Sequence, residues 1–364
     1  MPHSAFPADV ELWYSQRGGA TTTALALRKH WLQDEFAGGG VRLLSLEQAA
    51  SRDIRLSHYH HGHSGLLREG SNVSAIWARA QGQQAVVVGI TSVDEFQGVF
   101  VRAGGKLREL GDLKRRRLGL PLRRHALVDL QRASALRGFR NALLVAGLAP
   151  DAANWVHIES PDFEYPQRIS GRAIEVEALM SDYVDAIFLR GAQGVAAARD
   201  GRLQLLADLN QQADPLLRAN SGTPRTITVD QPFLQRHPQL VARYLAALLR
   251  TAGWARHNGQ AVRQLVALET PEYAPELVAA SHGAALQHAF TPQLGEAAIA
   301  ALTAQKDFLR ETGFIRSDID IAQWIAPAPL RDALRLQAER TRAAVLSNVR
   351  AEAWHASVAG LRAH

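Results

Sequence analysis

The feature that most constrains the fold is an alternation of short apolar runs with amphipathic segments over the first 210 residues. Ala85–Thr91 is almost wholly apolar and rich in valine, as expected of a strand buried on both faces. Other strands are expected at Glu11–Ser15, Val41–Leu46, Arg117–Leu122, Trp155–Glu159, Val184–Leu189 and Arg202–Leu209, and helices at Thr21–Phe36, Ser71–Arg79, Ala126–Val145 and Arg172–Met180. This order predicts an α/β fold of parallel sheets covered by helices.

Two breaks in the alternation predict two lobes. Ser92–Lys106 and Asn210–Pro224 interrupt the pattern, and the chain beyond Pro232 is mostly helical. We therefore expect a discontinuous lobe one from residues 1–95 and 220–330, a lobe two from 100–215, and a basic helical tail over 331–364. Because ligands of open parallel sheets bind at the carboxyl ends of the strands, two such lobes would enclose a ligand in the cleft between them.

Composition excludes several classes of function. The 364 residues include no cysteine, so disulfides, thiolate metal sites and a cysteine nucleophile are all excluded. The net charge of +6, from 41 basic and 35 acidic residues, favours an anionic ligand. The basic run Lys114–Arg117 has no interleaved aromatic residues, so we expect a solvated face and no nucleic-acid partner. No run reaches the roughly 18 apolar residues that cross a bilayer, so no membrane insertion is expected.

A first candidate anion site follows the expected strand Glu11–Ser15. Two glycines turn the chain there, and a helix is expected to begin directly after them. The first amides of a helix lack partners and lie at the positive end of its dipole, so they favour a bound oxyanion. An arginine adds a planar fork of donors. The predicted site residues are Ser15, Arg17, Gly18, Gly19 and Thr21; the alternative is an ordinary glycine turn with a threonine N-cap.

A histidine cluster comes next, with His58, His60, His61 and His63 within six residues. Such a cluster invites a zinc interpretation, since imidazole nitrogens are good ligands. However, His58 and His60 would share one face of a strand, and no carboxylate lies within the cluster. We therefore expect a polar loop with one or two functional histidines, and neither a metal site nor a cofactor.

A second candidate anion site begins ten residues after His58. Arg68 is followed by Gly70, Ser71 and Asn72, where a helix is expected to start. The arginine offers bidentate donors and the new helix offers free amides. A surface arginine beside a routine N-cap is the alternative.

Several segments resemble a known superfamily. Lobe two and the tail are similar to the sulfonate-, nitrate- and taurine-type substrate-binding proteins of ABC transporters at Val99–Lys114, Val184–Ile187, Gln305–Leu309 and Ile319–Ile321. Within that superfamily, the 2'-hydroxybiphenyl-2-sulfinate desulfinases are the most similar group. The shared motifs, in the same order over about residues 11–334, are Trp13–Ser15, His58-Tyr59, Arg68-x-Gly70-Ser71, Trp254–Arg256 and Gln323–Pro327.

The resemblance implies a two-lobed type II periplasmic-binding-protein-like fold with an interlobe cleft. In the desulfinases a catalytic cysteine after the Tyr-Ser-x segment works with a histidine, an arginine ten residues later and a glycine amide. His58 and Arg68 match that histidine and arginine, and Ser71 stands where the desulfinases have a second glycine. Arg17 stands at the cysteine position. Because an arginine stays protonated, it binds an anion but is a poor nucleophile.

Two functions remain open on the sequence. The first is a binding protein for a sulfonate- or sulfinate-like organic anion, linked to ABC-type uptake or sulfur-compound utilisation, with an ABC transporter permease as a possible partner. The second is a desulfinase-like hydrolase that cleaves a C–S bond without a cysteine, in which His58 acts as a general base. The first residues carry no secretory leader, which predicts a cytoplasmic protein as written and a periplasmic one if the start is truncated.

Overall fold

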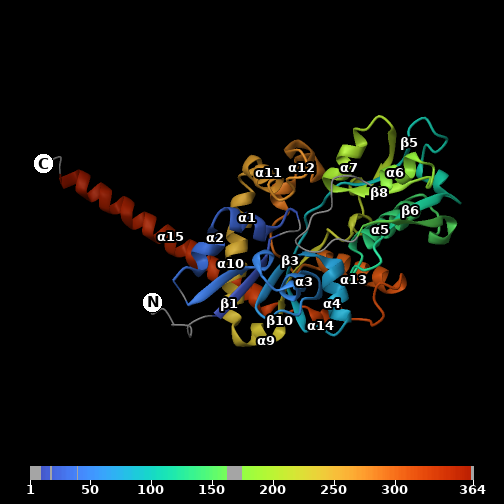
Figure 1. The fold of residues 1–364 in the computed structure, drawn as a ribbon. Coiled ribbons are helices and arrows are strands. Elements are labelled where there is room, and N and C mark those ends of the chain that lie inside the picture. The colour runs from blue at the N-terminus through green and yellow to red at the C-terminus, as the bar shows by residue number, and fades with distance from the viewer. Residues whose placement is uncertain (1–9, 17–18, 39, 162–173, 362–364) are drawn as a thin grey trace.

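Two α/β lobes lie side by side in the computed structural model, which describes residues 10–16, 19–38, 40–161 and 174–361 (Figure 1). Arg17 and Gly18, two of the predicted anion contacts, lie outside the described residues. Side chains are described as far as residue 346.

Lobe one is built on a five-stranded sheet in the order β2-β1-β3-β10-β4. β1 pairs in parallel with β2 and β3, whereas β10 is antiparallel to both β3 and β4. The chain therefore leaves this sheet after β4 and returns as β10, between β3 and β4. The strands are β1 (Val10–Ser15), β2 (Val41–Ser45), β3 (Leu66–Ser71), β4 (Ala85–Thr91) and β10 (Arg225–Asp230).

The residues between β4 and β10 form the sheet of lobe two. β5 (Gln97–Arg102) lies between β8 (Ile187–Arg190) and β9 (Leu203–Asp208), and β6 (Arg117–Leu122) runs parallel to β7 (Asn154–Glu159). A parallel bridge from Leu118 to Ala186 joins the two groups of strands. α5 (Leu130–Val145) covers this sheet, where Phe139 packs against Phe188.

Helices cover both faces of the lobe-one sheet, because its strands bury apolar side chains on both sides. One face buries Leu12, Leu67 and Ile227 against α1, α2, α9 and α10, and the other buries Ile90 against α4, α13 and α14. The bounds are α1 (Thr22–Arg28), α2 (Trp31–Phe36), α3 (Arg52–His60), α4 (Asn72–Ala80), α9 (Gln231–Arg236), α10 (Pro238–Ala255), α11 (Gly259–Ala267), α12 (Pro275–Ser281), α13 (Glu296–Glu311) and α14 (Ile321–Trp324), with α6 (Ile174–Met180), α7 (Gly191–Ala198) and α8 (Pro215–Arg218) in the inserted segment.

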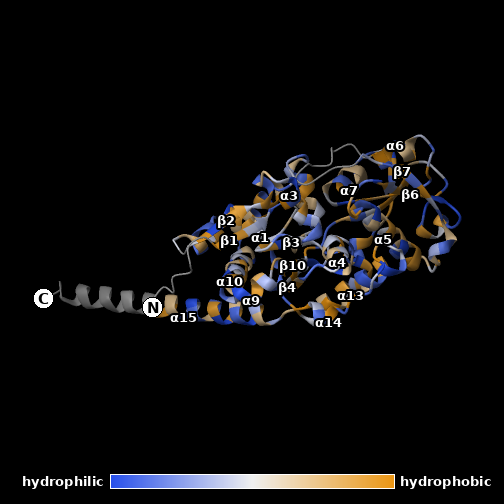
Figure 2. Cartoon of the chain, turned by 60° about the horizontal axis from the view of Figure 1, so that its bottom comes forward, coloured by the Kyte–Doolittle hydropathy of each residue, from blue (hydrophilic) through white to orange (hydrophobic). Residues whose placement is uncertain are grey.

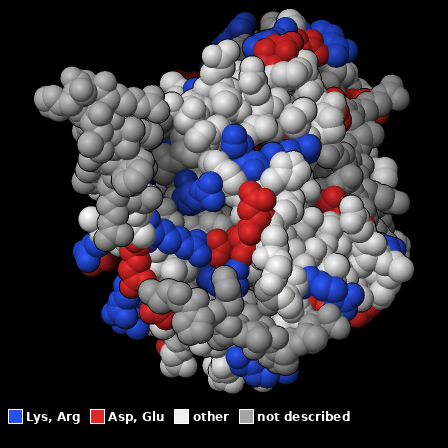
Figure 3. Space-filling view, turned by 90° about the vertical axis from the view of Figure 1, so that its left-hand side faces the viewer, with Lys and Arg blue, Asp and Glu red and all other residues white. Residues whose placement is uncertain are grey.

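The chain ends in a long helix, α15 (Ala328–Leu361), which extends away from the body (Figure 1). Its first turns pack on lobe one through Leu330, Ala333 and Leu336, and Arg340 pairs with Glu35. Apolar residues concentrate inside the two lobes (Figure 2). No helix among the described residues is both long and apolar enough to cross a bilayer. Basic and acidic side chains lie intermixed on the face shown in Figure 3.

Several expected elements differ from those in the structure. The expected helix Thr21–Phe36 is two helices, because the chain turns at His30, whose φ is 59°. The prediction that His58 and His60 share one face of a strand is wrong, because Ser51 caps a helix, α3, and the two residues point in different directions on it. The first predicted break contains β5. The expected boundaries of the lobes and tail stay a prediction.

Candidate functional site

Ser15 and Arg68 face the same side of the lobe-one sheet. They are directly paired where β1 runs parallel to β3, so their side chains project from the same face. The hydroxyl of Ser15 lies 2.8 Å from Nδ1 of His58, in the last turn of α3. All three side chains are buried, with exposed fractions of 1%, 1% and 7%. The structure thus brings together three of the predicted site residues that lie on separate elements.

Gly70 makes room for the guanidinium of Arg68. The two residues lie two apart on β3 and therefore share a face. A Cβ placed on Gly70 would lie 2.8 Å from Nη2 and 2.9 Å from Cζ of Arg68. Nη1 of Arg68 donates to the carbonyl of Ser71 at 3.2 Å. The Arg-x-Gly pattern therefore directs the charged group along its own strand, toward the strand's carboxyl end.

His61 also belongs to this cluster, although nothing in the sequence around it distinguishes it from His60 and His63. It ends α3 with a left-handed φ of 56°. The hydroxyl of Thr228 donates to the carbonyl of Arg68 at 3.4 Å and lies 3.1 Å from Nδ1 of His61. If the hydroxyl proton points to that carbonyl, Nδ1 of His61 carries a proton and Nε2 is an acceptor.

Both histidines are held in the neutral form. Burial lowers the pKa of His58 and of His61 well below the ordinary value, and the positive charge of Arg68 lowers both further. A neutral imidazole accepts a proton or a hydrogen bond through one nitrogen and donates through the other. The cluster therefore concentrates its positive charge on Arg68, where burial strengthens its attraction for an anion.

The N-terminus of α4 is largely occupied by protein groups. Ser71 caps Val73, and the backbone amide of Asn72 donates to the carbonyl of Ser221 at 3.3 Å. The side-chain amide of Asn72 donates to the carbonyls of Asn220 and Pro224, both at 2.8 Å. Because residues 220–224 lead back from lobe two into β10, Asn72 ties the predicted site to this connection between the lobes.

The N-terminus of α1 holds an internal carboxylate. Glu69 accepts hydrogen bonds from the backbone amides of Thr22 and Thr23, at 3.0 and 2.8 Å, and from the hydroxyl of Thr91 at 2.9 Å. Thr21 caps the next free amide, that of Ala24. The anion that the sequence leads one to expect at this helix is therefore supplied by the protein itself. Among the described predicted contacts of this loop, Gly19 is half-exposed, with a φ of 81°.

Arg225 is a buried cation that the sequence analysis missed. It opens β10 opposite Ser71, and its Nη2 would lie 3.7 Å from a Cβ placed on Gly19. Burial lowers its pKa, which the charges of Glu95 and Glu69 partly restore. Glu95 accepts a hydrogen bond from Arg190 at 2.8 Å. The alternating polar and β-branched residues of 225–230 were the available signal for a strand here.

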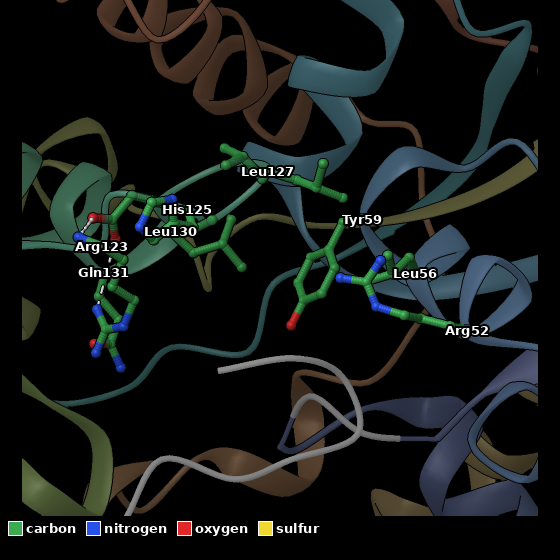
Figure 4. Close-up of a pocket in the computed structure, with 11 residues that line it drawn as sticks. Arg52, Leu56, Tyr59, Arg123, His125, Leu127, Leu130 and Gln131 are labelled. Atoms are coloured by element: carbon green, nitrogen blue, oxygen red, sulfur yellow. Dashed lines mark hydrogen bonds and ion pairs between the residues drawn. The ribbon is translucent and has the colours of Figure 1, made fainter. Parts of the chain in front are cut away.

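A pocket of about 120 Å³ opens between the lobes beside the histidine cluster (Figure 4). Arg52, Leu56 and Tyr59 form one wall; they recur at i, i+4 and i+7 on α3 and so share one face of that helix. Residues 123 and 125–131 of lobe two form the other wall. The ring of Tyr59 lies edge-on to that of His58, with centroids 5.0 Å apart. The strand or loop expected around His58–His63 hid this helical spacing.

No group of three or more His, Asp or Glu side chains positioned to hold a metal ion occurs within the described ranges of the chain.

Proteins of known structure share the fold of this chain. No protein-family model matches the chain. The 2'-hydroxybiphenyl-2-sulfinate desulfinase of Rhodococcus erythropolis is 24% identical over 310 residues, covering 76% of this chain and 83% of the desulfinase. A crystal structure of the desulfurization enzyme DSZB superposes with a TM-score of 0.68 and 22% identity, covering 89% of this chain and 99% of the enzyme.

Sulfonate-binding proteins have the same architecture. The periplasmic aliphatic sulphonate-binding protein SsuA of Escherichia coli superposes with a TM-score of 0.63 and 16% identity, covering 88% of this chain and 92% of SsuA. A putative periplasmic sulfonate-binding protein from Methylobacillus flagellatus KT gives 0.70 and 14%, covering 91% and 95%. The predicted resemblance and the two-lobed periplasmic-binding-protein-like fold are therefore confirmed.

We expect Glu69→Gln to destabilise the protein by about 2–4 kcal/mol, because an amide replaces one acceptor oxygen with a donor that faces the α1 amides. Urea unfolding measures this. Glu296→Gln is the matched control, since Glu296 is an exposed acid in the first turn of α13 and should change stability by only a few tenths of a kcal/mol. An equally small effect at Glu69 would contradict the capping role.

Stability should also fall in acid. The pKa values of His58 and His61 lie well below the ordinary 6.5 in the folded protein, so below that pH the unfolded chain takes up protons that the folded chain does not. Each histidine should therefore lower the free energy of unfolding by about 1.4 kcal/mol per pH unit below about pH 6.5. Urea unfolding at about ten pH values between 7.5 and 5 measures how the free energy of unfolding changes with pH.

His61→Asn should reduce this slope, since asparagine tolerates a left-handed backbone but does not titrate. His30→Asn is the control, because His30 is exposed and has nearly the same φ, 59°. Equal slopes in the two variants would show that His61 does not titrate in this way.

Proposed function

We propose that this chain is a binding protein for a sulfonate- or sulfinate-like organic anion. The observation that carries the proposal is the buried guanidinium of Arg68, held over Gly70 among the neutral side chains of Ser15, His58 and His61. A buried charge-assisted hydrogen bond is stronger than an exposed one, and a planar guanidinium fits two oxygens of one head group. His58 donates or accepts one further hydrogen bond.

Thr21 and Asn72 leave the set of predicted head-group contacts, because their side chains are bonded within the protein; the other predicted contacts stay part of this proposal. Amides of the Gly18–Gly19 loop and of Gly70–Ser71 complete the cradle, and Arg17 adds a second positive charge. Proteins with the same fold support a sulfur oxyanion as the head group of the ligand. They include sulfonate-binding SsuA proteins and a mutant DSZB in complex with biphenyl-2-sulfinic acid. An ABC transporter permease is the partner proposed on the same basis, and utilisation of sulfur compounds is the proposed context.

Calorimetry tests the proposal with butane-1-sulfonate and benzenesulfinate, and with butyl methyl sulfone as a neutral counterpart. The two anions should bind and the sulfone should not. Arg68→Gln should weaken anion binding by about tenfold or more, as expected for loss of a hydrogen bond to a charged group. Arg42→Gln, an exposed arginine paired with Glu11 on the same sheet, should leave binding unchanged.

Because Arg68 is buried, its replacement could prevent folding, and a second variant avoids this difficulty. Gly70→Ala keeps the charge but places a methyl group against the guanidinium. Gly201→Ala is the control, since no atom lies within 4 Å of the added methyl group. If Gly70→Ala binds the anions as tightly as Gly201→Ala does, Arg68 is not the head-group site.

The second candidate function is a desulfinase-like hydrolase. The hydrogen bond of 2.8 Å between Ser15 and His58 favours it, because a neutral buried imidazole beside a hydroxyl is suited to accept a proton. The balanced reaction is an aryl sulfinate plus water giving the arene and hydrogen sulfite. His58 takes a proton from the attacking water, the C–S bond breaks, and the ring carbon gains a proton.

Sulfite release from benzenesulfinate by the purified protein distinguishes the two functions. A hydrolase should release sulfite with turnover, and both Ser15→Ala and His58→Asn should reduce its rate at least tenfold. His30→Asn should leave the rate unchanged. Binding of benzenesulfinate without release of sulfite would leave the binding protein as the sole function of this site.

A further inference from the structure

A second pocket with basic walls lies in lobe two, where β5 ends and β6 begins. Its volume of about 160 Å³ has room for several water molecules, and therefore for a phosphate group. β5 begins directly after the crossing between the lobes, and its last residue, Arg102, lines this pocket. Because a strand rises about 3.4 Å per residue, Arg102 lies about 17 Å along β5 from the crossing. The pocket shares no lining residue with the interlobe pocket, and its strands lie in the half of the body away from β1 (Figure 1).

The two acidic residues of this pocket are paired within the protein. A carboxylate oxygen of Asp182 lies 2.7 Å from Nη2 of Arg102 and 3.4 Å from Nη2 of Arg117. Asp185 accepts hydrogen bonds from the backbone amide of Arg117 at 2.7 Å and from its Nη2 at 2.8 Å. Each carboxylate is thus matched by an arginine, and the acids fix the positions of Arg102 and Arg117.

Two further basic side chains, Lys106 and Arg116, line the pocket. Both are exposed, and neither has an ion-pair partner in the part of the chain that the structure describes. Nε of Arg116 donates to the carbonyl of Asp112 at 3.3 Å, which orients the guanidinium and leaves its η nitrogens for a ligand. Together with the paired groups, these two cations give this region a net charge of +2.

Apolar side chains form the inner wall of the pocket. Val101, Leu107 and Val184 line it and are buried. Such a wall cannot hydrogen-bond to an anion, but it replaces water on one side of the pocket. The attraction between an anion and the nearby cations is therefore less screened than on an open surface.

We propose that this pocket binds a doubly charged tetrahedral oxyanion, either inorganic phosphate or the phosphoryl group of a phosphate monoester. A guanidinium donates to two phosphate oxygens at once, and a lysine ammonium adds a compact positive charge. The basic run Lys114–Arg117 then serves two purposes, since Arg116 binds the anion and Arg117 holds the acids. This site is independent of the function proposed for the Arg68 cluster.

Calorimetry at low ionic strength and about pH 8 tests the proposal, with phosphate and methyl phosphate as probes. Both are mainly dianions at this pH. We expect Lys106→Gln and Arg116→Gln each to weaken phosphate binding about fivefold, as for loss of a well-formed exposed ion pair. Lys114→Gln is the matched control, because Lys114 is exposed in the same basic run but does not line the pocket. All three substitutions are at the surface and should leave folding intact.

The proposal is wrong if the wild-type protein binds neither probe, or if Lys106→Gln and Arg116→Gln bind phosphate as tightly as Lys114→Gln does. It is also wrong if Gly70→Ala abolishes phosphate binding while Lys106→Gln does not, because the ion would then lie at the Arg68 cluster. Where binding depends on Lys106 and Arg116, equal affinity for methyl phosphate assigns the site to phosphate monoesters. A preference for phosphate assigns it to the free ion, and either result supports the site.

Discussion

The candidate site depends on one charged side chain that is kept out of water. Arg68 lies on β3 inside the lobe-one sheet, and a guanidinium in that position is costly unless hydrogen bonds and nearby anions compensate it. The absence of a side chain at Gly70 gives the guanidinium its space, and the carbonyl of Ser71 accepts one of its hydrogen bonds. Its charge also helps to keep His58 and His61 neutral, since a second positive charge beside it would be unfavourable.

Strand β3 serves two purposes because alternate residues face opposite sides of the sheet. Arg68 and Gly70 face the histidine cluster, whereas Glu69 faces α1 and binds its first amides. One short strand thus presents a cation toward the candidate ligand site and an anion toward the helix behind it. Both Arg68 and the first turn of α1 are therefore positioned by the same strand.

The fold itself is compatible with both candidate functions. Proteins described as sulfonate-binding and the desulfurization enzyme DSZB superpose on this chain at similar TM-scores. What distinguishes binding from cleavage is therefore the chemistry of a few side chains. The chain has no cysteine, so a water molecule activated by the neutral His58 beside Ser15 would have to attack in place of a thiolate. Sulfite release is consequently the decisive measurement.

The sequence by itself determined the local chemistry: the α/β alternation, strands such as β4 and β6 at their observed bounds, and the Arg68-x-Gly70 pattern, because these depend on residues close together in the chain. It did not reveal that residues 52–60 form a helix, that β10 returns to the sheet with Arg225, or that α3 faces residues 123 and 125–131 across a pocket. Nor did it reveal that Glu69 fills the N-terminus of α1. The helix at residues 52–60 is a local feature, capped by Ser51, that was not recognised in the sequence. The other features arise from contacts between residues far apart in sequence, which local propensity does not encode, and only the tertiary structure decided them.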